Sequence, residues 1–449
     1  MKEILSPVRA LQKLLPPQKK LKADVRYKLS QYALEIDVDG RHVLFNTLTQ
    51  QACEMDRLLP AYLPGKRISD EDDLAGLVRG YFYVPEDQDE CAFYESLFCM
   101  MHAHFIGQGI KGYTILPTLV CNARCVYCYE AGMPQTVMTM DTAEQTVRYM
   151  LETRSEERID LNWFGGEPLL GVSVMDRICG ELSRHDVPFT SYMVTNGSLI
   201  TEDVADRMAG PWRIRDVQIS MDGAEKDYIA RKQYVRCGDQ YHAVLQSVNL
   251  LNARGIRVWV RCNVDGENID GVLPFLEDMK AAVKDKELTD LYFAPLNAVY
   301  TGEDSLKIQR KIENLRPWIR DAGFGGKRDL YPMGQFRAWH CMADLGSVVI
   351  APDGGLYACD ECLPKSRFGD VWHGVTDPEA RQAFCRVDQV RDSCRACPFL
   401  PRCTPFASCP IYVKECRKLF EQALKDRLKR VLQGENESAD REHSLFENC

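Results

Sequence analysis

Residues 121–129 read CNARCVYCY and place three cysteines within eight positions, directly after the apolar run 113–120. A loop this short can turn Cys121, Cys125 and Cys128 toward one point. Three sulfurs suit a cubane iron–sulfur cluster with one iron left open, whereas a closed zinc or 4Fe–4S site takes a fourth ligand. The nearest downstream cysteine is Cys179, far outside this loop. The alternative interpretation is three buried or redox-paired thiols.

The length and composition of the chain are those of a globular protein of two or three domains, with 449 residues, 45% hydrophobic and 27% charged. A net charge of −9 argues against nucleic-acid binding. No apolar run is long enough to span a bilayer, and no signal peptide follows the Met-Lys-Glu start, so we expect a cytoplasmic protein with no membrane partner. In a reducing compartment, nineteen cysteines indicate metal ligands rather than a disulfide framework.

Between residues 112 and 297, apolar runs alternate with amphipathic stretches such as 241–253. This alternation predicts parallel strands connected by helices, an α/β fold that closes toward a barrel. Chemistry on such barrels gathers at the carboxyl ends of the strands. The six predicted strands lie at 113–120, 159–164, 190–195, 215–221, 256–263 and 290–295.

Short polar motifs follow the second, third and fourth of these predicted strands: FGGEP at 164–168, TNG at 195–197 and SMDG at 220–223. Together with the CxxxCxxC spacing and the aromatic Tyr127 before the third cysteine, they resemble the radical S-adenosylmethionine (radical SAM) enzymes. The resemblance implies a partial (β/α)6 TIM-like radical SAM barrel, with a SAM-binding 4Fe–4S cluster on the three cysteines. It further implies that an electron from the cluster cleaves SAM to a 5′-deoxyadenosyl radical, which abstracts a substrate hydrogen.

The resemblance also implies a set of contacts to SAM. Glycines let a backbone approach a ligand closely, and a neighbouring carboxylate accepts bonds from an ammonium, here the SAM amino group. The polar side chains that follow the third and fourth predicted strands are implied to bond the ribose and the methionine carboxylate of SAM. An arginine is also suited to bind this carboxylate. For each motif alone the alternative is turn chemistry. The implied contacts are Tyr127, Gly165, Gly166, Glu167, Asn196, Ser220, Asp222 and Arg231, with Arg261 and Asn263 at the same rim.

A second group of nine cysteines lies within 76 residues of the C-terminal part. Their spacing resembles the SPASM extension, a Cys-rich domain that holds two auxiliary 4Fe–4S clusters, and includes a hairpin around Gly354. A zinc ribbon is the alternative for part of the set. The resemblance implies Cys394, Cys397, Cys403 and Cys416 as ligands of the outer cluster, and Cys341, Cys359 and Cys409 as ligands of the inner one.

Two departures bear on the inner cluster. The step from Cys403 to Cys409 is longer than usual in the family, and no cysteine lies between Cys341 and Cys359. Either Cys362 supplies a fourth ligand, or one iron stays free to bind a substrate thiolate. Asp360 occupies a position where sulfatase-maturing relatives have a proposed general base, which can take a proton during oxidation. Alternatively, Asp360 is a turn residue, or it contacts the cluster ligands and takes no proton.

The N-terminal part predicts an arm or short helix over 1–31, a hairpin of 32–37 and 42–46, and a helix from Thr49 to about Leu59. A second helix and a strand-like run at 80–84 follow an acidic break. This N-terminal α+β part resembles peptide-recognition modules, which bind a leader peptide by strand addition; an extension that caps the barrel is the alternative. The predicted domains are an N-terminal extension (1–108), the barrel (109–300), a helical bridge (301–339), the SPASM domain (340–432) and a disordered tail (433–449).

The resemblance covers residues 112–418 and implies an enzyme acting on a peptide. We expect a maturase that installs a thioether cross-link in a ribosomally made precursor peptide with leader and core, as sactipeptide and ranthipeptide maturases do. A flavodoxin or ferredoxin is the expected electron donor. The alternatives are carbon–carbon or carbon–oxygen cross-linking and oxidation to formylglycine of the sulfatase-maturing type. Two further alternatives involve no SAM chemistry: an iron–sulfur electron carrier and a zinc-binding interaction protein.

Overall fold

A computed structural model describes residues 2–5, 25–55, 71–106, 109–155, 158–296, 305–324, 346–383, 392–402 and 416–434. Predictions on Cys341, Cys403 and Cys409, on the Cys416 side chain and on the tail after residue 434 lie outside this part. No helix within it is long and apolar enough to cross a membrane.

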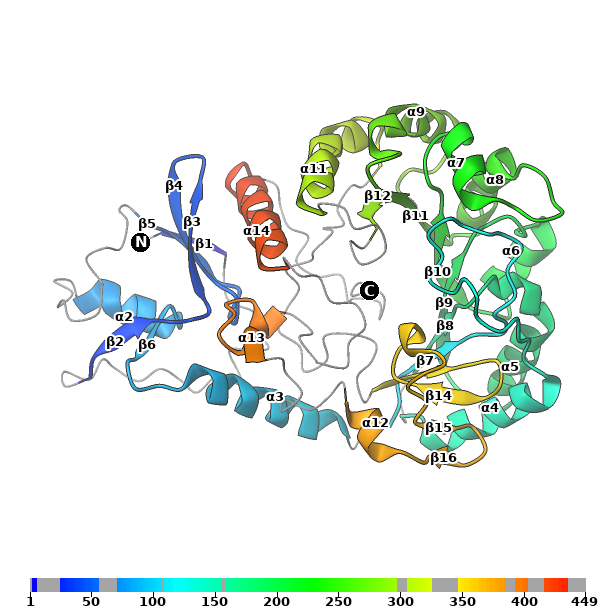
Figure 1. Cartoon of the computed structure of the whole chain (residues 1–449), viewed down its shortest axis with the longest axis horizontal. Coiled ribbons are helices and arrows are strands. Elements are labelled where there is room, and N and C mark those ends of the chain that lie inside the picture. Colours follow the sequence, from blue (N-terminus) through cyan, green and yellow to red (C-terminus); the bar gives the residue numbers. More distant parts are fainter. Residues whose placement is uncertain are drawn as a thin grey trace.

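A curved parallel sheet surrounded by helices dominates one side of the molecule (Figure 1). Strands that follow one another in the chain are neighbours in the sheet, and each pair is parallel. This confirms the predicted partial barrel. The first predicted run leaves the sheet after Ile115, close to Pro117, which lacks the N–H that a central strand needs. The strands are β7 (Gly112–Ile115), β8 (Ile159–Trp163), β9 (Phe189–Thr195), β10 (Ile214–Ser220), β11 (Arg257–Val264) and β12 (Thr289–Pro295).

The helices cover the outer face of this sheet. Two of them begin at a threonine whose hydroxyl accepts a hydrogen bond from the first turn: Thr139 from the Thr142 amide and Thr201 from the Val204 amide. One set of alternate strand residues, including Trp163 and Val217, is buried in the core with these helices, so the other set lies on the concave face. The helices are α4 (Met140–Thr153), α5 (Val172–Arg184), α6 (Glu202–Ala209), α7 (Glu225–Lys232), α8 (Tyr241–Asn252) and α9 (Val272–Ala282).

The C-terminal hairpin continues the barrel sheet. β13 (Ser347–Ile350) pairs in parallel with β7, and β14 (Gly355–Tyr357) returns antiparallel to it, which confirms the predicted hairpin. A Cβ on Gly354, whose φ is +77°, would lie 2.4 Å from the Trp372 ring, so the turn needs glycine. The short strands β15 (Gly369–Asp370) and β16 (Gly374–Val375) extend the sheet further.

The N-terminal part contains a four-stranded antiparallel sheet in the order β1 (Lys2–Leu5), β5 (Ala52–Met55), β4 (Arg41–Asn46) and β3 (Ala33–Val38). The predicted hairpin is confirmed. Asp39 and Gly40 have φ of +54° and +81° in its turn, as a two-residue hairpin requires. The helix expected from Thr49 is wrong over β5, because pairing with β4 buries Ala52 and Cys53 completely. The arm or short helix expected at the start is likewise wrong over β1.

Three further elements complete this part of the molecule: a two-stranded sheet of β2 (Tyr27–Leu29) and β6 (Tyr83–Pro85), and the helices α2 (Glu71–Arg79) and α3 (Glu90–Ile106). α2 confirms the helix predicted after the acidic break. In the predicted bridge, α11 (Ser305–Asp321) is helical as expected. The short helices α12 (Pro378–Gln382) and α13 (Asp392–Arg395) precede the C-terminal helix.

The first and last parts of the chain share a core. Leu424 and Leu428 of α14 (Cys416–Leu432) are buried with Phe45 and with Phe399, and α14 stands beside the N-terminal sheet in Figure 1. Ion pairs join the same parts, with Lys429 Nζ 2.9 Å from Asp39 Oδ2. The N-terminal sheet is therefore anchored to the cysteine-rich end of the chain.

Candidate active site

The cysteine loop lies at the carboxyl edge of the barrel sheet and is held there by its backbone. The amide of Arg124 donates to the Lys232 carbonyl at 3.0 Å, and that of Val126 donates to the Arg231 carbonyl at 3.0 Å. In return, the Val235 amide donates to the Asn122 carbonyl at 2.8 Å. The end of α7 therefore fixes the position of the loop.

The three loop thiols are half-buried. The Ala123 amide donates to Cys121 Sγ at 3.4 Å, the kind of bond that tunes cluster sulfurs. Burial raises the pKa of Cys121 to about 12 and also raises that of Cys128, whereas binding to a soft metal ion favours the thiolate form of such ligands. Within the described ranges no three Cys, His, Asp or Glu side chains converge tightly enough for a single metal ion.

The two glycines of the FGGEP motif give room to the chain that enters the cysteine loop. A Cβ on Gly165, whose φ is +106°, would lie 2.4 Å from the Thr118 carbonyl oxygen, and one on Gly166 would lie 2.5 Å from that of Val120. The Gly166 amide also donates to the Thr118 carbonyl at 3.1 Å. Both positions therefore need glycine so that the chain entering the cysteine loop can approach them, and their contact to SAM stays a prediction.

Glu167 connects the end of β8 to the end of β9. Its carboxylate is completely buried and accepts hydrogen bonds from the Leu169 amide at 3.1 Å, the Thr195 hydroxyl at 2.7 Å and the Asn196 amide at 2.9 Å. Burial raises the pKa of this carboxyl group, and the three hydrogen bonds oppose that rise. The Asn196 side chain then donates to Asn122 Oδ1 in the cysteine loop at 2.8 Å.

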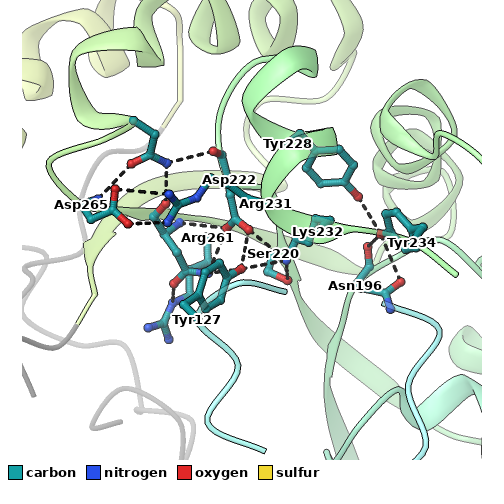
Figure 2. Close-up of polar contacts among 12 residues, drawn as sticks. Tyr127, Asn196, Ser220, Asp222, Tyr228, Arg231, Lys232, Tyr234, Arg261 and Asp265 are labelled. Atoms are coloured by element: carbon teal, nitrogen blue, oxygen red, sulfur yellow. Dashed lines mark hydrogen bonds and ion pairs between the residues drawn. The ribbon is translucent and has the colours of Figure 1, made fainter. Parts of the chain in front are cut away.

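Ser220 and Asp222 meet Tyr127 and a lysine that the sequence analysis did not single out (Figure 2). Lys232 Nζ lies 2.7 Å from Ser220 Oγ, 3.1 Å from the Tyr127 hydroxyl and 3.3 Å from Asp222 Oδ2. The Tyr127 hydroxyl also donates to Asp222, whose other oxygen accepts from Asn263 Nδ2 at 3.0 Å. Four of the expected SAM contacts or rim residues thus converge on one buried ion pair.

Arg231, the expected partner of the SAM carboxylate, is paired within the protein. Its guanidinium forms a two-point ion pair with Asp265, at 2.7 and 3.2 Å, and both side chains are nearly buried. It also lies 5.5 Å from the centre of the Tyr127 ring. Arg261 Nε donates to Asn263 Oδ1 at 2.9 Å, and Figure 2 shows its guanidinium pointing away from Lys232. Arg261 and Asn263 therefore do lie at the rim where they were expected.

The C-terminal hairpin brings Asp360 to the cysteine loop. The Tyr129 hydroxyl donates to Asp360 Oδ2 at 2.5 Å, and the Cys359 thiol lies 3.5 Å from Asp360 Oδ1. A hydrogen bond with Cys359 lowers the pKa of Cys362, so these two thiols are neighbours. Burial, reinforced by the charge of Asp360, raises the pKa of Glu130 to about 7.

The other described cysteines of the C-terminal group lie against the N-terminal part. Cys394 packs on the core that contains Tyr94 and Leu400, and Cys397 on the core that contains Phe399. Their assignment to an outer cluster remains a prediction, because the ligands expected beside them lie outside the described residues.

Residues 115–279 match the model of the Radical SAM superfamily, so this part of the chain is a radical SAM domain. Among curated proteins the chain is similar to an S-adenosylmethionine-dependent nucleotide dehydratase of Thermoplasmatales archaeon, with 28% identity over 163 residues, or 36% of this chain and 55% of the relative. The chain spans about half the length of the first curated relatives that it matches.

Two solved structures share the fold over more of the chain. One is anSMEcpe with bound AdoMet and Cp18Cys peptide, with a TM-score of 0.54 and 17% identity, covering 72% of this chain and 98% of that one. The other is Streptococcus suis SuiB bound to precursor peptide SuiA, with a TM-score of 0.52 and 13% identity, covering 87% of this chain and 99% of that one. At these identities the likeness shows the fold alone.

Proposed function

We propose that this chain is a radical SAM enzyme that installs a thioether cross-link in a ribosomally made precursor peptide. The observation that carries the proposal is the meeting of the cysteine loop, the Ser220–Asp222 strand end and the Cys359–Asp360 segment at one rim of the barrel. A 4Fe–4S cluster and SAM would together supply a 5′-deoxyadenosyl radical at this rim.

The residues of the rim have complementary tasks. Cys121, Cys125 and Cys128 would hold the cluster, and Ser220 and Asp222 hold Lys232 beside the cysteine loop. SAM carries an amino group and a carboxylate, so a site that combines acceptors with a fixed cation suits it. Glu167 and Asn196 would act by positioning, because their side chains are already bonded to protein. A flavodoxin or ferredoxin would deliver the electron.

A peptide substrate is supported by the surroundings of the site. The anSMEcpe and SuiB structures that share this fold contain peptides. Among the described residues the N-terminal antiparallel sheet ends at β1 and β3, and extended peptides bind to the edges of sheets by adding a strand. Because α14 anchors this sheet to the cysteine-rich segment, a leader bound there would keep the core peptide close to the barrel. The N-terminal part would thus act as the leader-binding module.

Thioether formation removes two hydrogens from the substrate. A hydrogen atom leaves a carbon for the SAM-derived radical, the new carbon–sulfur bond forms, and the thiol proton and one electron must leave. Asp360 would take the proton; its contacts support this role, since Tyr129 holds one carboxylate oxygen and the other lies 3.5 Å from the Cys359 thiol. The C-terminal thiols would hold the acceptor of the electron, an auxiliary 4Fe–4S cluster on Cys359 and another on Cys394 and Cys397.

One contact favours a second candidate function. The neighbouring thiols of Cys359 and Cys362 suit two ligands of the same cluster. A fully ligated cluster has no iron to bind a substrate thiolate. In that case carbon–carbon or carbon–oxygen cross-linking, or oxidation to formylglycine, fits the site better than thioether formation.

Co-expression with a short Cys-rich peptide encoded beside the gene tests the proposal. After anaerobic expression and full reduction of disulfides, mass spectrometry should show a peptide lighter by two hydrogens whose cysteine no longer reacts with iodoacetamide. A peptide lighter by two hydrogens with a reactive thiol would instead support carbon–carbon or carbon–oxygen coupling. An unmodified Cys-rich peptide, together with formylglycine formation in a sulfatase peptide, would contradict the thioether proposal.

A further inference from the structure

Three cations lie near one another at the carboxyl edge of the barrel: Arg231, Lys232 and Arg261 (Figure 2). Two of them are paired within the protein. Arg231 forms the two-point ion pair with Asp265, and Lys232 Nζ lies 3.3 Å from Asp222 Oδ2. In the described part of the chain no carboxylate forms an ion pair with Arg261. The rim of the barrel therefore presents a guanidinium whose charge these residues leave without a partner.

Arg261 lies on the concave face of the barrel sheet. On β10, Val217 and Ile219 are buried in the core with the helices, so the alternate residue Ser220 is on the concave side, and Arg261 is its partner on β11. On its other side Arg261 is the partner of Tyr292 on β12. The Arg261 side chain is half-buried. A cation that has lost part of its water is stabilised by a bound anion.

One hydrogen bond fixes the direction of the Arg261 side chain. Its Nε donates to Asn263 Oδ1 at 2.9 Å, whereas Nδ2 of the same amide donates to the Tyr127 hydroxyl at 3.1 Å and to Asp222 Oδ1 at 3.0 Å. Arg261 therefore lies on the side of Asn263 that faces away from these two groups, and its guanidinium points away from Lys232 in Figure 2. The two Nη groups remain for a ligand, and this fork matches a carboxylate with two hydrogen bonds.

We propose that Arg261 determines substrate specificity by binding a carboxylate of the substrate peptide, the side chain of an Asp or Glu near the residue that loses its hydrogen. The inference rests on the proposed function, which places SAM against the cysteine loop and a peptide beyond it. The Asn263 amide separates Arg261 from Tyr127 of that loop. A carboxylate bound by Arg261 therefore belongs to the ligand on the far side of SAM, and it fixes which peptide residue faces the radical.

A double-mutant cycle between enzyme and peptide tests this pair. The probes are the Cys-rich peptide encoded beside the gene and a panel in which each of its Asp and Glu residues is changed singly to Asn or Gln. We expect one panel member to raise the wild-type KM for the peptide by about 10- to 100-fold, as for loss of a hydrogen bond to a charged group. Arg261→Gln should raise the KM for the unchanged peptide by a similar factor, and the same panel member should then cause no further loss.

Two further variants define what is lost. Arg261→Lys keeps the charge but not the planar fork, so its KM for the peptide should lie between those of the wild type and Arg261→Gln. The control is Arg184→Gln on the outer helix α5, which removes a positive charge elsewhere and should give wild-type values. In Arg261→Gln the KM for the peptide should rise by a larger factor than the KM for SAM.

Additive losses from Arg261→Gln and every panel member would overturn the inference. So would an Arg261→Gln protein whose KM rises for SAM but not for the peptide, because Arg261 would then bind SAM. If Arg261→Gln holds less iron than the wild type, the cycle is run with Arg261→Lys, and additivity there also overturns the inference. A wild type that never modifies the peptide refutes the proposed function together with this inference, whereas additivity in an active wild type refutes only the role of Arg261.

Discussion

The Tyr129 hydroxyl donates a 2.5 Å hydrogen bond to Asp360 across 231 positions of the sequence. Tyr129 follows the last cysteine of the loop, and Asp360 follows Cys359, the first cysteine after the C-terminal hairpin. The bond therefore joins the two segments whose cysteines are proposed to hold different clusters. It is possible because β13 pairs with β7 and returns the chain to the same edge of the sheet.

Asp360→Asn should leave SAM cleavage intact and lower product formation by roughly 100- to 10,000-fold, the range for loss of a general base. Tyr129→Phe keeps the carboxylate but removes a hydrogen bond to it, and should lower product formation by about tenfold. The measurement is the ratio of modified peptide to 5′-deoxyadenosine.

The matched control for these variants is Glu379→Gln, an exposed acidic residue of the same C-terminal segment, which should retain the wild-type ratio. Loss of SAM cleavage in a folded, iron-loaded Asp360→Asn protein would show that Asp360 belongs to the SAM site. Full product formation by that variant would remove it from the reaction.

Arg231→Gln tests whether Arg231 is structural or binds SAM. Because it leaves Asp265 nearly buried and unpaired, we expect a loss of about 3–5 kcal/mol in the free energy of unfolding. The exposed Arg184, paired with Glu181, is the control, and Arg184→Gln should change the free energy by less than about 0.5 kcal/mol. Unfolding by urea measures both. An unchanged stability with a much weaker affinity for SAM would instead support the contact implied by the family resemblance.

Leu424→Ala should loosen the N-terminal sheet although Leu424 lies on the C-terminal helix. The side chain is completely buried against β3 and β4, and such truncations cost about 2–5 kcal/mol. Hydrogen exchange of residues 33–46 should therefore become faster. Lys425→Ala, at the exposed neighbouring position, should not change it. Unchanged protection of β3 and β4 in Leu424→Ala would mean that the shared core does not stabilise the sheet.

Glu90 gives the N-terminal part a defined pH dependence. Burial raises the pKa of its carboxyl group above the ordinary value of 4.5, against the opposing hydrogen bonds from Ser30 and Gln31. The folded state therefore binds this proton more tightly than the unfolded state, so the contribution of Glu90 to stability is greatest below pH 4.5 and declines as pH rises through the folded-state pKa. Glu90→Gln should remove this decline, as measured by unfolding between about pH 4.5 and pH 8. Parallel pH curves for the two proteins would contradict the prediction.

The strands of the barrel could be predicted from short stretches of sequence, because each strand has its own apolar run followed by a polar or turn motif. Val217 and Ile219 form a buried face, and an Asp-Gly turn follows them, so strand and strand end can both be recognised within one short window. At Ala52, however, the local sequence pattern predicts the wrong element. The surrounding residues favour a helix, but pairing of Ala52 with Phe45 imposes a strand.

The contacts that complete the site depend on distant packing. Lys232 ends a charged helix, a position that usually faces solvent, and its burial results from the Tyr127 loop more than one hundred positions earlier. Arg231, its neighbour, looked equally suited to a ligand, and only the position of Asp265 shows that its charge is already paired. Identifying which of two adjacent cations faces the site therefore required the folded chain.

The central claim is that Cys121, Cys125 and Cys128 bind an iron–sulfur cluster that serves SAM cleavage. The most direct measurement is 5′-deoxyadenosine formation by anaerobically reconstituted protein with SAM and dithionite, alongside its iron and sulfide content. We predict product from the wild type and from Cys99→Ala, an exposed cysteine of α3, and none from Cys128→Ala, which should also contain less iron. A wild-type protein that holds zinc, or that holds iron and never forms 5′-deoxyadenosine, would contradict this account.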